Sequence, residues 1–367
     1  MDFSLTEAQR DLAGLAGRIL GDWAERDGDQ RTEPFDDPFD ATLWEQLAQA
    51  GLLDAALPES VGGGGFGLLE QCSVLIELGR VAAPVPYLPS ITGAASAIAE
   101  FGTGLHAERW ALPVTRGQRT MAIALADEGD DPGFTARRAG GSWRVSGTQT
   151  AVLHGAHADA FACEVATDEG DALMLVDRGH SGLRVTGQHA VDGTGAALVE
   201  LDEAEATDDA LLGEPGSGAA RWLRLRATVG LCALQLGIVS RALEMTGEYA
   251  RKREQFGEVI GSFQAVRQRL AEAYLDVEAV RLTLWQAAWR LSEGLPADEE
   301  VATAKFWAAQ AGHRVAHTAV HIHGGVGIDM DYPLHRYFVA AKRTEFALGG
   351  ATAQLRALGT HLAEAPA

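Results

Sequence analysis

Two short segments near the C-terminus contain residues that could bind the phosphates of a dinucleotide. One begins at Arg253, and the other contains the adjacent glycines Gly324 and Gly325. An arginine at a helix end offers fixed positive charge and planar donors that suit a pyrophosphate. A Gly-Gly turn lets backbone amides approach a phosphate because no Cβ stands in the way. Either segment alone could be an ordinary helix end with a glycine cap, but the two together, in this order, favour a binding role.

A second set of candidate residues is a series of histidines at every fourth position. His313, His317 and His321 could lie along one face of a helix. No cysteine or carboxylate ligand stands beside them in the sequence, and a single helix cannot surround a metal ion with three such residues. We therefore expect packing or interface roles for these histidines and predict no metal site.

The composition argues against several classes of function. Among 367 residues, 51 acidic and 30 basic side chains give a formal charge of −21. This charge disfavours sequence-independent binding to nucleic acid or to an anionic membrane surface. Because no export signal and no segment of roughly 20 apolar residues is apparent, we expect a cytoplasmic protein without membrane insertion. The cysteines, Cys72, Cys163 and Cys232, have no metal-ligand spacing and are expected to be buried, reduced thiols.

The N-terminal and C-terminal parts have the apolar periodicity of helices. Ser4 and Glu7 predict a capping box at the start of the first helix. The other expected N-terminal elements are a helix that stops at Gly51, a glycine-rich loop from Leu57 to Gly67, and a helix that ends at Gly79. The expected C-terminal helices are one that runs to Arg253, one from about Phe263 to Glu293, one from Asp298 to His323, and one that begins near Pro333. The C-terminal helices are long enough for an up-down bundle.

The middle of the chain, from about Met121 to Leu212, has the pattern of β-strands. Short alternating or β-branched runs are separated there by glycine and aspartate. They predict six or more antiparallel strands in a compact sheet. The chain is therefore expected to be mainly α with a central β domain. The predicted division is an N-terminal helical domain over residues 1–115, a middle β domain over 116–215 and a C-terminal helical bundle over 216–367.

Motifs across the whole chain resemble those of acyl-CoA dehydrogenases. The run REQFGEVIGSFQ, from Arg253 to Gln264, resembles the family signature R-x-x-F-G-x-x-I-x-x-F-Q. The run HIHGGVG from His321, with the downstream Y-P-x-x-R of Tyr332, resembles the family's Q-x-x-G-G-x-G turn and its Y-P-x-x-R motif. Trp44 and the run PESVGG match the N-terminal pattern of the family. The resemblance implies the acyl-CoA dehydrogenase fold, with an N-terminal helical domain, a middle antiparallel β-sheet domain and a C-terminal four-helix bundle.

The resemblance also implies FAD as the cofactor and an acyl-CoA as the substrate. In this family the two C-terminal motifs reach across a subunit interface and hold the FAD of the neighbouring subunit. The cofactor-binding residues that it implies here are Arg253, Gln255, Phe256, Gln264, His321, Gly324 and Gly325. His321 stands where the family usually has glutamine, and its imidazole could still donate or accept one hydrogen bond.

The catalytic base of the family has no counterpart in this sequence. Acyl-CoA dehydrogenases remove an α-proton with a glutamate while a hydride passes to flavin N5. The usual position of that glutamate holds Gly349 here, and the alternative position used by some members holds Ala227. Residues within a turn of Ala227 are also not carboxylates. Glu345 is a weak substitute, because a charged residue on a solvated helix face is the simpler interpretation.

The part of the flavin site that each subunit normally provides for itself also departs from the family pattern. The family's W-I-T tripeptide aligns with Ala151-Val152-Leu153, and its T-E-P-x-x-G-S-D loop aligns with the segment from Ala126 to Asp131. Ala351 and Ala353 replace the Thr and Gln that follow the family's glutamate. The residues that would bind the chain's own flavin are therefore mostly missing, whereas those that would serve a neighbour are present.

This division resembles one subunit type of the actinobacterial heterotetrameric acyl-CoA dehydrogenases that act on CoA thioesters of steroid side chains. The resemblance implies a catalytic paralogue as partner, with two copies of each chain, and an electron-transferring protein as acceptor. Two alternatives stay open: a self-sufficient homo-oligomer with a relocated base such as Glu345, and a cofactor-free scaffold subunit.

Overall fold

The computed structural model describes residues 5–28, 39–125 and 133–364. Contacts between Cα atoms divide the chain into two compact units, neither of them continuous in sequence. The helical unit consists of Met1–Glu33, Cys72–Ala83 and Thr228–Ala367, and the sheet unit consists of Pro34–Gln71 and Pro84–Ala227. The division into three consecutive domains, with boundaries near residues 115 and 215, stays a prediction from the sequence.

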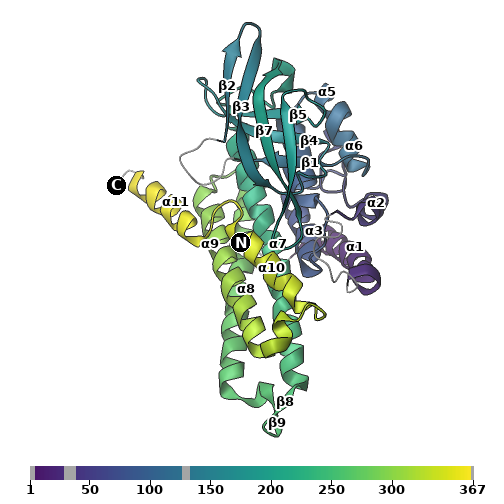
Figure 1. The fold of residues 1–367 in the computed structure, drawn as a ribbon, viewed down its shortest axis with the longest axis vertical. Helices are drawn as coiled ribbons and strands as arrows, with labels where there is room; N and C mark the ends of the chain where they lie inside the picture. Colours follow the sequence, from purple (N-terminus) through teal and green to yellow (C-terminus); the bar gives the residue numbers. More distant parts are fainter. Residues whose placement is uncertain (1–4, 29–38, 126–132, 365–367) are drawn as a thin grey trace. The chain divides into compact units, whose positions relative to one another are not determined.

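The helical unit is built around long C-terminal helices. Its elements are α1 (Glu7–Trp23), most of α3 (Leu68–Arg80), most of α7 (Ala219–Lys252), α8 (Gln264–Ser292), α9 (Asp298–His323), α10 (Leu334–Phe346) and α11 (Ala351–Glu364). Helix α9 packs against α8, α10 and α11, and Figure 1 shows the long helices of this unit running side by side. Ile238 of α7, Ala319 of α9 and Tyr337 of α10 belong to one buried cluster. The expected C-terminal bundle is confirmed.

Small residues allow these helices to approach closely. A Cβ added to Gly237 of α7 would lie 2.0 Å from the carbonyl oxygen of Ile76, and one added to Gly79 of α3 would lie 2.2 Å from the carbonyl oxygen of Leu234. These distances are far below van der Waals contact, so the backbones of α3 and α7 touch only because both residues are glycine.

The start of the first helix differs from the prediction. Thr6, not Ser4, is the N-cap of α1, and its hydroxyl accepts a hydrogen bond from the Gln9 amide while the Gln9 side chain accepts one from the Thr6 amide. Ser4 lies outside the described residues. The capping box is therefore two residues later than expected, because Thr6 and Gln9 offer the same chemistry as Ser4 and Glu7.

Helix α7 also corrects the expectation that no segment is apolar and long enough to cross a membrane. It meets that criterion by length and composition, with a mean hydropathy of 1.3 over its most apolar window, but 78% of that window is buried inside the protein. A core helix that is covered by protein on most sides needs apolar residues around most of its circumference.

The sheet unit contains seven strands and four α-helices among its described residues. The strands are β1 (Met121–Ala124), β2 (Phe134–Ala139), β3 (Ser142–Val152), β4 (Ala160–Ala166), β5 (Ala172–Asp177), β6 (Leu183–His189) and β7 (Gly195–Ala206). The helices are α2 (Ala41–Gln49), α4 (Ser96–Phe101), α5 (Gly104–His106) and α6 (Leu112–Thr115). One face of the sheet packs around Phe134, Trp143 and Phe161. Leu57–Gly67 has no α-helix or strand and contains only the short 3-10 turn Glu59–Val61, as expected for a loop.

The sheet is mixed, which corrects the prediction of an antiparallel sheet. Its order is β1-β4-β2-β3-β7-β6, with β5 paired to β4. The pairs β1–β4 and β2–β4 are parallel, and the other pairs are antiparallel. Side-chain alternation indicates which face of a strand is buried but not the direction of its neighbour. That direction depends on the connection, and β1 reaches β4 only after the β2–β3 hairpin.

The cysteines confirm the prediction of buried thiols. Cys72, Cys163 and Cys232 are all free and buried. Burial in apolar surroundings raises the pKa of both Cys163 and Cys232 to about 12. The thiol is then the stable form of each, and neither is suited to nucleophilic or redox chemistry.

Candidate cofactor-binding surface

A short hairpin follows helix α7 and carries the first predicted motif. Strands β8 (Glu254–Gln255) and β9 (Glu258–Val259) pair with each other, and Phe256 and Gly257 form the turn with φ angles of 56° and 80°. A two-residue turn of this kind requires positive φ at both central positions, which suits glycine but costs a bulky residue roughly 1–2 kcal/mol. Phe256 is nevertheless 94% exposed. Its ring meets that of Phe263 edge-on, with centroids 6.3 Å apart, but this contact leaves most of the side chain uncovered.

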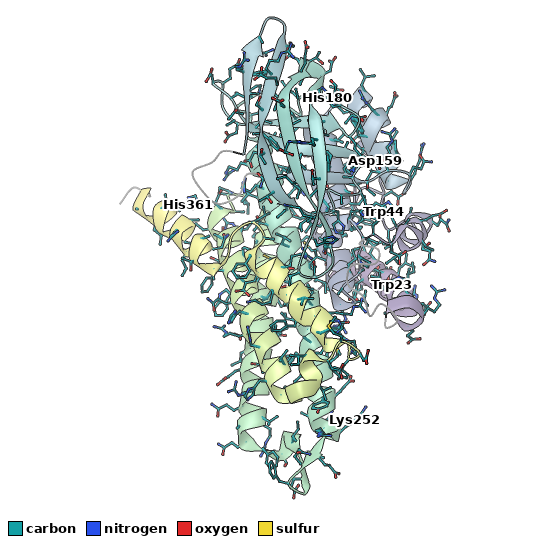
Figure 2. The ribbon with its side chains drawn as sticks, viewed as in Figure 1. Trp23, Trp44, Asp159, His180, Lys252 and His361 are labelled. Carbon is teal, nitrogen blue, oxygen red and sulfur yellow. The ribbon has the colours of Figure 1, made fainter. Side chains whose placement is uncertain are left out.

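The polar residues of the motif are exposed on a fixed backbone. The amide of Arg253 donates to the carbonyl of Tyr249 at 2.8 Å, and its own carbonyl accepts from the amide of Ile260 at 2.8 Å. Its exposed guanidinium makes no ion pair within the described ranges 5–28, 39–125 and 133–364. Gln255 and Gln264, the first residue of α8, are also exposed. The donors therefore face outward from a rigid base. Figure 2 labels Lys252, the last residue of α7, at the base of this hairpin.

The second motif forms a turn at the end of helix α9. Gly324 has φ 64° and ψ −138°, a conformation that is essentially restricted to glycine. Gly325 does not have a left-handed backbone, and a Cβ added to it would meet no atom within 4 Å. No contact within residues 5–28, 39–125 and 133–364 therefore requires glycine at residue 325. An exposed glycine with open space is expected where an outside group approaches the backbone.

The structure brings the two motifs to the same end of the helical bundle. Ala250 of α7, Ile260 beside the hairpin and Ile322 of α9 form one buried cluster, and Tyr249 and Phe263 pack against it. We call the predicted residues at this end the bundle-end surface, which consists of Arg253, Gln255, Phe256, Gln264, His321, Gly324 and Gly325. All seven are exposed. Their separation in sequence is overcome by packing between the ends of α7, α8 and α9.

The two candidate base positions lack a carboxylate. Gly349 lies buried between α10 and α11 with φ 91°, next to Leu348 with φ 52°. The side-chain amide of Gln354 donates to the carbonyl of Leu348 at 3.1 Å and holds this connection. Ala227 is fully buried in α7. Its neighbour Arg224 forms an ion pair with Glu164.

Glu345 corrects another expectation. Its side chain is only 12% exposed, so it does not lie on a solvated helix face. One oxygen lies 2.5 Å from Nζ of Lys342, and the other lies 3.3 Å from Nδ1 of His313. Polar partners on its own helix and on α9 make this burial tolerable. Both oxygens therefore have polar partners within the helical unit.

The first described segment of the expected own-subunit flavin site, which begins at Ala151, makes contacts inside the sheet unit. Ala151 has φ 54°, and its amide donates to Oε1 of Gln188 at 2.9 Å, while the Thr150 hydroxyl lies 3.2 Å from the same oxygen. Val152 is buried at the end of β3. The segment from Ala126 to Asp131 lies outside the described residues. The backbone donor at the position of the family's tryptophan is thus already used by β6.

The histidine series is placed on α9 as the spacing predicted. The rings of His313 and His317 lie 4.5 Å apart, and His317 meets Phe338 edge-on. Partial burial lowers the pKa of His317, and the nearby His313 and Lys342 lower it further. No group of three or more potential metal ligands gathers in the part of the chain that the structure describes.

The sequence did not identify His323 as part of the site. It ends α9, immediately before Gly324, and its ring lies between those of Tyr249 and Tyr332. The only sequence signal was its position inside the HIHGGVG run.

Comparison with known proteins places the chain in a family. Residues 13–118 match the family model described as the acyl-CoA dehydrogenase N-terminal domain, and residues 221–363 match that of the C-terminal domain. The acyl-CoA dehydrogenase FadE27 of Mycobacterium tuberculosis is 48% identical, with full coverage of both chains. A chain of the ChsE4-ChsE5 complex from Mycobacterium tuberculosis is 48% identical with a TM-score of 0.95 and full coverage of both chains. A chain of a Tcur3481-Tcur3483 steroid ACAD variant is 39% identical with a TM-score of 0.89 and 98% coverage of both chains. This chain belongs to the acyl-CoA dehydrogenase family.

Proposed function

We propose that this chain is the non-base-carrying subunit of a heteromeric, FAD-dependent acyl-CoA dehydrogenase. It completes the FAD site of a catalytic paralogue and is active only in that assembly. The observation that carries this proposal is the contrast between an exposed set of phosphate-compatible donors and a glycine at the base position, Gly349. Two of the similar structures, titled ChsE4-ChsE5 complex and Tcur3481-Tcur3483 steroid ACAD, name two proteins each, which supports a paralogous partner.

The bundle-end surface fits a dinucleotide that is bound from outside. Arg253 would hold the pyrophosphate through its planar donors. The amide of Gly325 would approach the phosphates or the adenine edge, which is easier without a Cβ. The amide of Gly324 donates to the carbonyl of Val320, so Gly324 would contribute the conformation of the turn. Gln255 and His321 would add hydrogen bonds, and Phe256 would pack against the neighbouring subunit or the cofactor. When bound, FAD supplies the acceptor for the hydride that leaves the β-carbon of the substrate.

The proton chemistry would belong to the partner. In α,β-dehydrogenation of an acyl-CoA a carboxylate removes the α-proton, and no such group is available here at Gly349 or Ala227. We propose a CoA thioester with a steroid side chain or another bulky acyl group as the substrate, since one similar structure is titled a steroid ACAD. An electron-transferring protein would reoxidise the flavin.

Co-expression with candidate paralogues tests this proposal. The chain alone is expected to be colourless and inactive, and the mixed complex is expected to bind FAD and to turn over. Native mass spectrometry gives the subunit ratio and the number of flavins in each assembly. A yellow, active chain without a partner would instead indicate the self-sufficient homo-oligomer.

Arg253→Ala separates a shared flavin site from a cofactor-free scaffold. Loss of a charge-assisted hydrogen bond to a phosphate is expected to weaken FAD binding by the complex about tenfold to a hundredfold. Arg184→Ala is the matched control, because Arg184 is an exposed strand residue that pairs with Glu200 in the sheet unit. If Arg253→Ala and Arg184→Ala complexes retain FAD equally, the scaffold interpretation is correct.

A further inference from the structure

The buried His323 connects the parts of the bundle-end surface. Its ring is stacked on Tyr249 with ring centroids 4.3 Å apart and an interplanar angle of 25°. On its other side, Nε2 lies 3.2 Å from the hydroxyl of Tyr332. Only 4% of the residue is exposed. Three segments therefore meet at this imidazole: the last turn of α7, the end of α9 and the loop that leads to α10.

The hydrogen bonds fix both the orientation and the tautomer of the ring. Nδ1 lies 2.8 Å from the carbonyl oxygen of Ala319, which can only accept, so Nδ1 carries the hydrogen. Nε2 must then accept from the Tyr332 hydroxyl. Both ring nitrogens are satisfied, and a fully satisfied buried network selects one side-chain arrangement.

The same contacts reach the two motifs that carry the exposed donors. The carbonyl of Tyr249 accepts from the amide of Arg253 at 2.8 Å, and the Tyr249 hydroxyl lies 3.5 Å from the carbonyl oxygen of His323, the residue before Gly324. A Cβ added to Gly327 would lie 3.1 Å from Cβ of His323, so the turn is packed directly against it. Tyr249 also packs against the cluster that contains Ile260, beside the hairpin.

We propose that His323 is a positioning residue that holds the Gly324-Gly325 turn in register with the Arg253 hairpin for cofactor binding. This inference rests on the proposed function. Simple packing of α7 against α9 would need only an apolar ring. A histidine with both nitrogens engaged adds orientation, because rotation of the ring or a shift of the turn breaks at least one hydrogen bond. The donors on the two segments must be correctly spaced to bind one ligand.

The test uses the co-expressed complex and measures FAD release on dilution, with native mass and thermal unfolding recorded in parallel. His323→Phe keeps a stacked ring and removes both hydrogen bonds, and Tyr332→Phe removes one hydroxyl. We expect His323→Phe to weaken FAD binding about tenfold and Tyr332→Phe about threefold, with the subunit ratio unchanged. His106→Phe is the control, since His106 is similarly buried but belongs to the sheet unit. It is expected to change stability and not FAD affinity.

The outcomes distinguish this inference from the proposed function. If His323→Phe and Tyr332→Phe lower only the unfolding temperature while Arg253→Ala weakens FAD binding, His323 has no positioning role and the shared site remains. If none of the three variants alters FAD affinity, the proposed function itself is wrong, and the positioning role falls with it. Should His323→Phe fail to assemble, Tyr332→Phe decides the question, because it removes a single atom from a half-buried residue.

Discussion

The bundle-end surface and the segment around Gly349 lie in the same helical unit and have opposite properties. The first carries exposed polar donors, an aromatic residue in a strained turn conformation and a glycine that its own chain does not require. The second has a buried glycine at the base position and a backbone held by Gln354. One region exposes polar groups and an aromatic ring, whereas the other lacks a carboxylate at the position where the family has its base. Under the proposed function, the contrast would mean that an acyl-CoA dehydrogenase subunit keeps its contribution to a neighbour without the base of its own.

The largest expected effect concerns the base position, where a glutamate can be introduced in place of Gly349. Gly349→Glu in the chain alone is expected to leave turnover of acyl-CoA below about a thousandth of that of the mixed complex. The backbone at residue 349 has φ 91°, which a glutamate adopts only with strain, and the positions of the own-subunit flavin site lack the family's residues. An assay with an artificial electron acceptor measures this. Substantial turnover would mean that the base was the only defect.

A conservative change at the bundle end sharpens the comparison. Arg253→Lys keeps the charge and loses the planar pair of donors. We expect FAD binding by the complex to weaken about fivefold to tenfold, less than for Arg253→Ala. Dilution of the holo-complex with detection of released flavin gives the affinity. Equal affinities for arginine and lysine would indicate that Arg253 acts only through long-range charge.

A substitution at Phe256 should change the stability of the isolated chain and the function of the complex in opposite directions. Phe256→Asn creates an Asn-Gly turn, which favours positive φ at both positions. The isolated chain is expected to become more stable by up to about 1 kcal/mol, as measured by chemical denaturation. In the same variant, either the fraction of chain that assembles with the paralogue or the amount of FAD that the complex retains should decrease, because the exposed aromatic ring is lost. A less stable chain in a fully functional complex would show that Phe256 serves its own fold through its contact with Phe263.

The smallest expected effect is a pH dependence of stability. Burial lowers the pKa of His323 below its ordinary value of 6.5, so the folded chain favours the neutral ring. The unfolded chain takes up the proton more readily, and the free energy of unfolding should therefore fall as the pH drops below 6.5. His323→Phe should make the free energy of unfolding depend less steeply on pH. Part of the pH dependence should remain, because the pKa of His317 is lowered too. Denaturation curves at several pH values check this, and identical slopes would exclude a contribution from His323.

The sequence predicted the C-terminal helices well because their signals are local. Helix α9 runs from Asp298 to His323, as predicted, and ends at the glycines that follow it. Strand β2 gives only a weak signal, because its sequence FTARRA is half polar and exposed. The parallel pairing of β1 with β4 was missed, since it joins segments that are far apart in sequence. Local patterns specify elements, whereas non-local pairing depends on the whole chain.

The candidate site was predictable in part for the same reason. The motif residues could be identified from their types and spacing, but their gathering at one end of the bundle depends on Ile260 and Ile322 packing together. The burial of Glu345 depends in part on His313 of α9, which only tertiary structure places beside it. Its other partner, Lys342, lies one turn earlier on the same helix. In the sequence, His323 is only a helix-terminal residue, and its proposed role rests on contacts with two tyrosines that no periodicity relates to it.

The glycines at the crossing of α3 and α7 limit how far the distance between these two helices can change. With no room for even a methyl group at Gly79 or Gly237, the spacing of these two helices is set by backbone contact alone. Side-chain substitutions elsewhere cannot easily shift that spacing. A protein built on such a crossing can exchange residues at its surfaces and in its connections while the distance between these two helices stays the same.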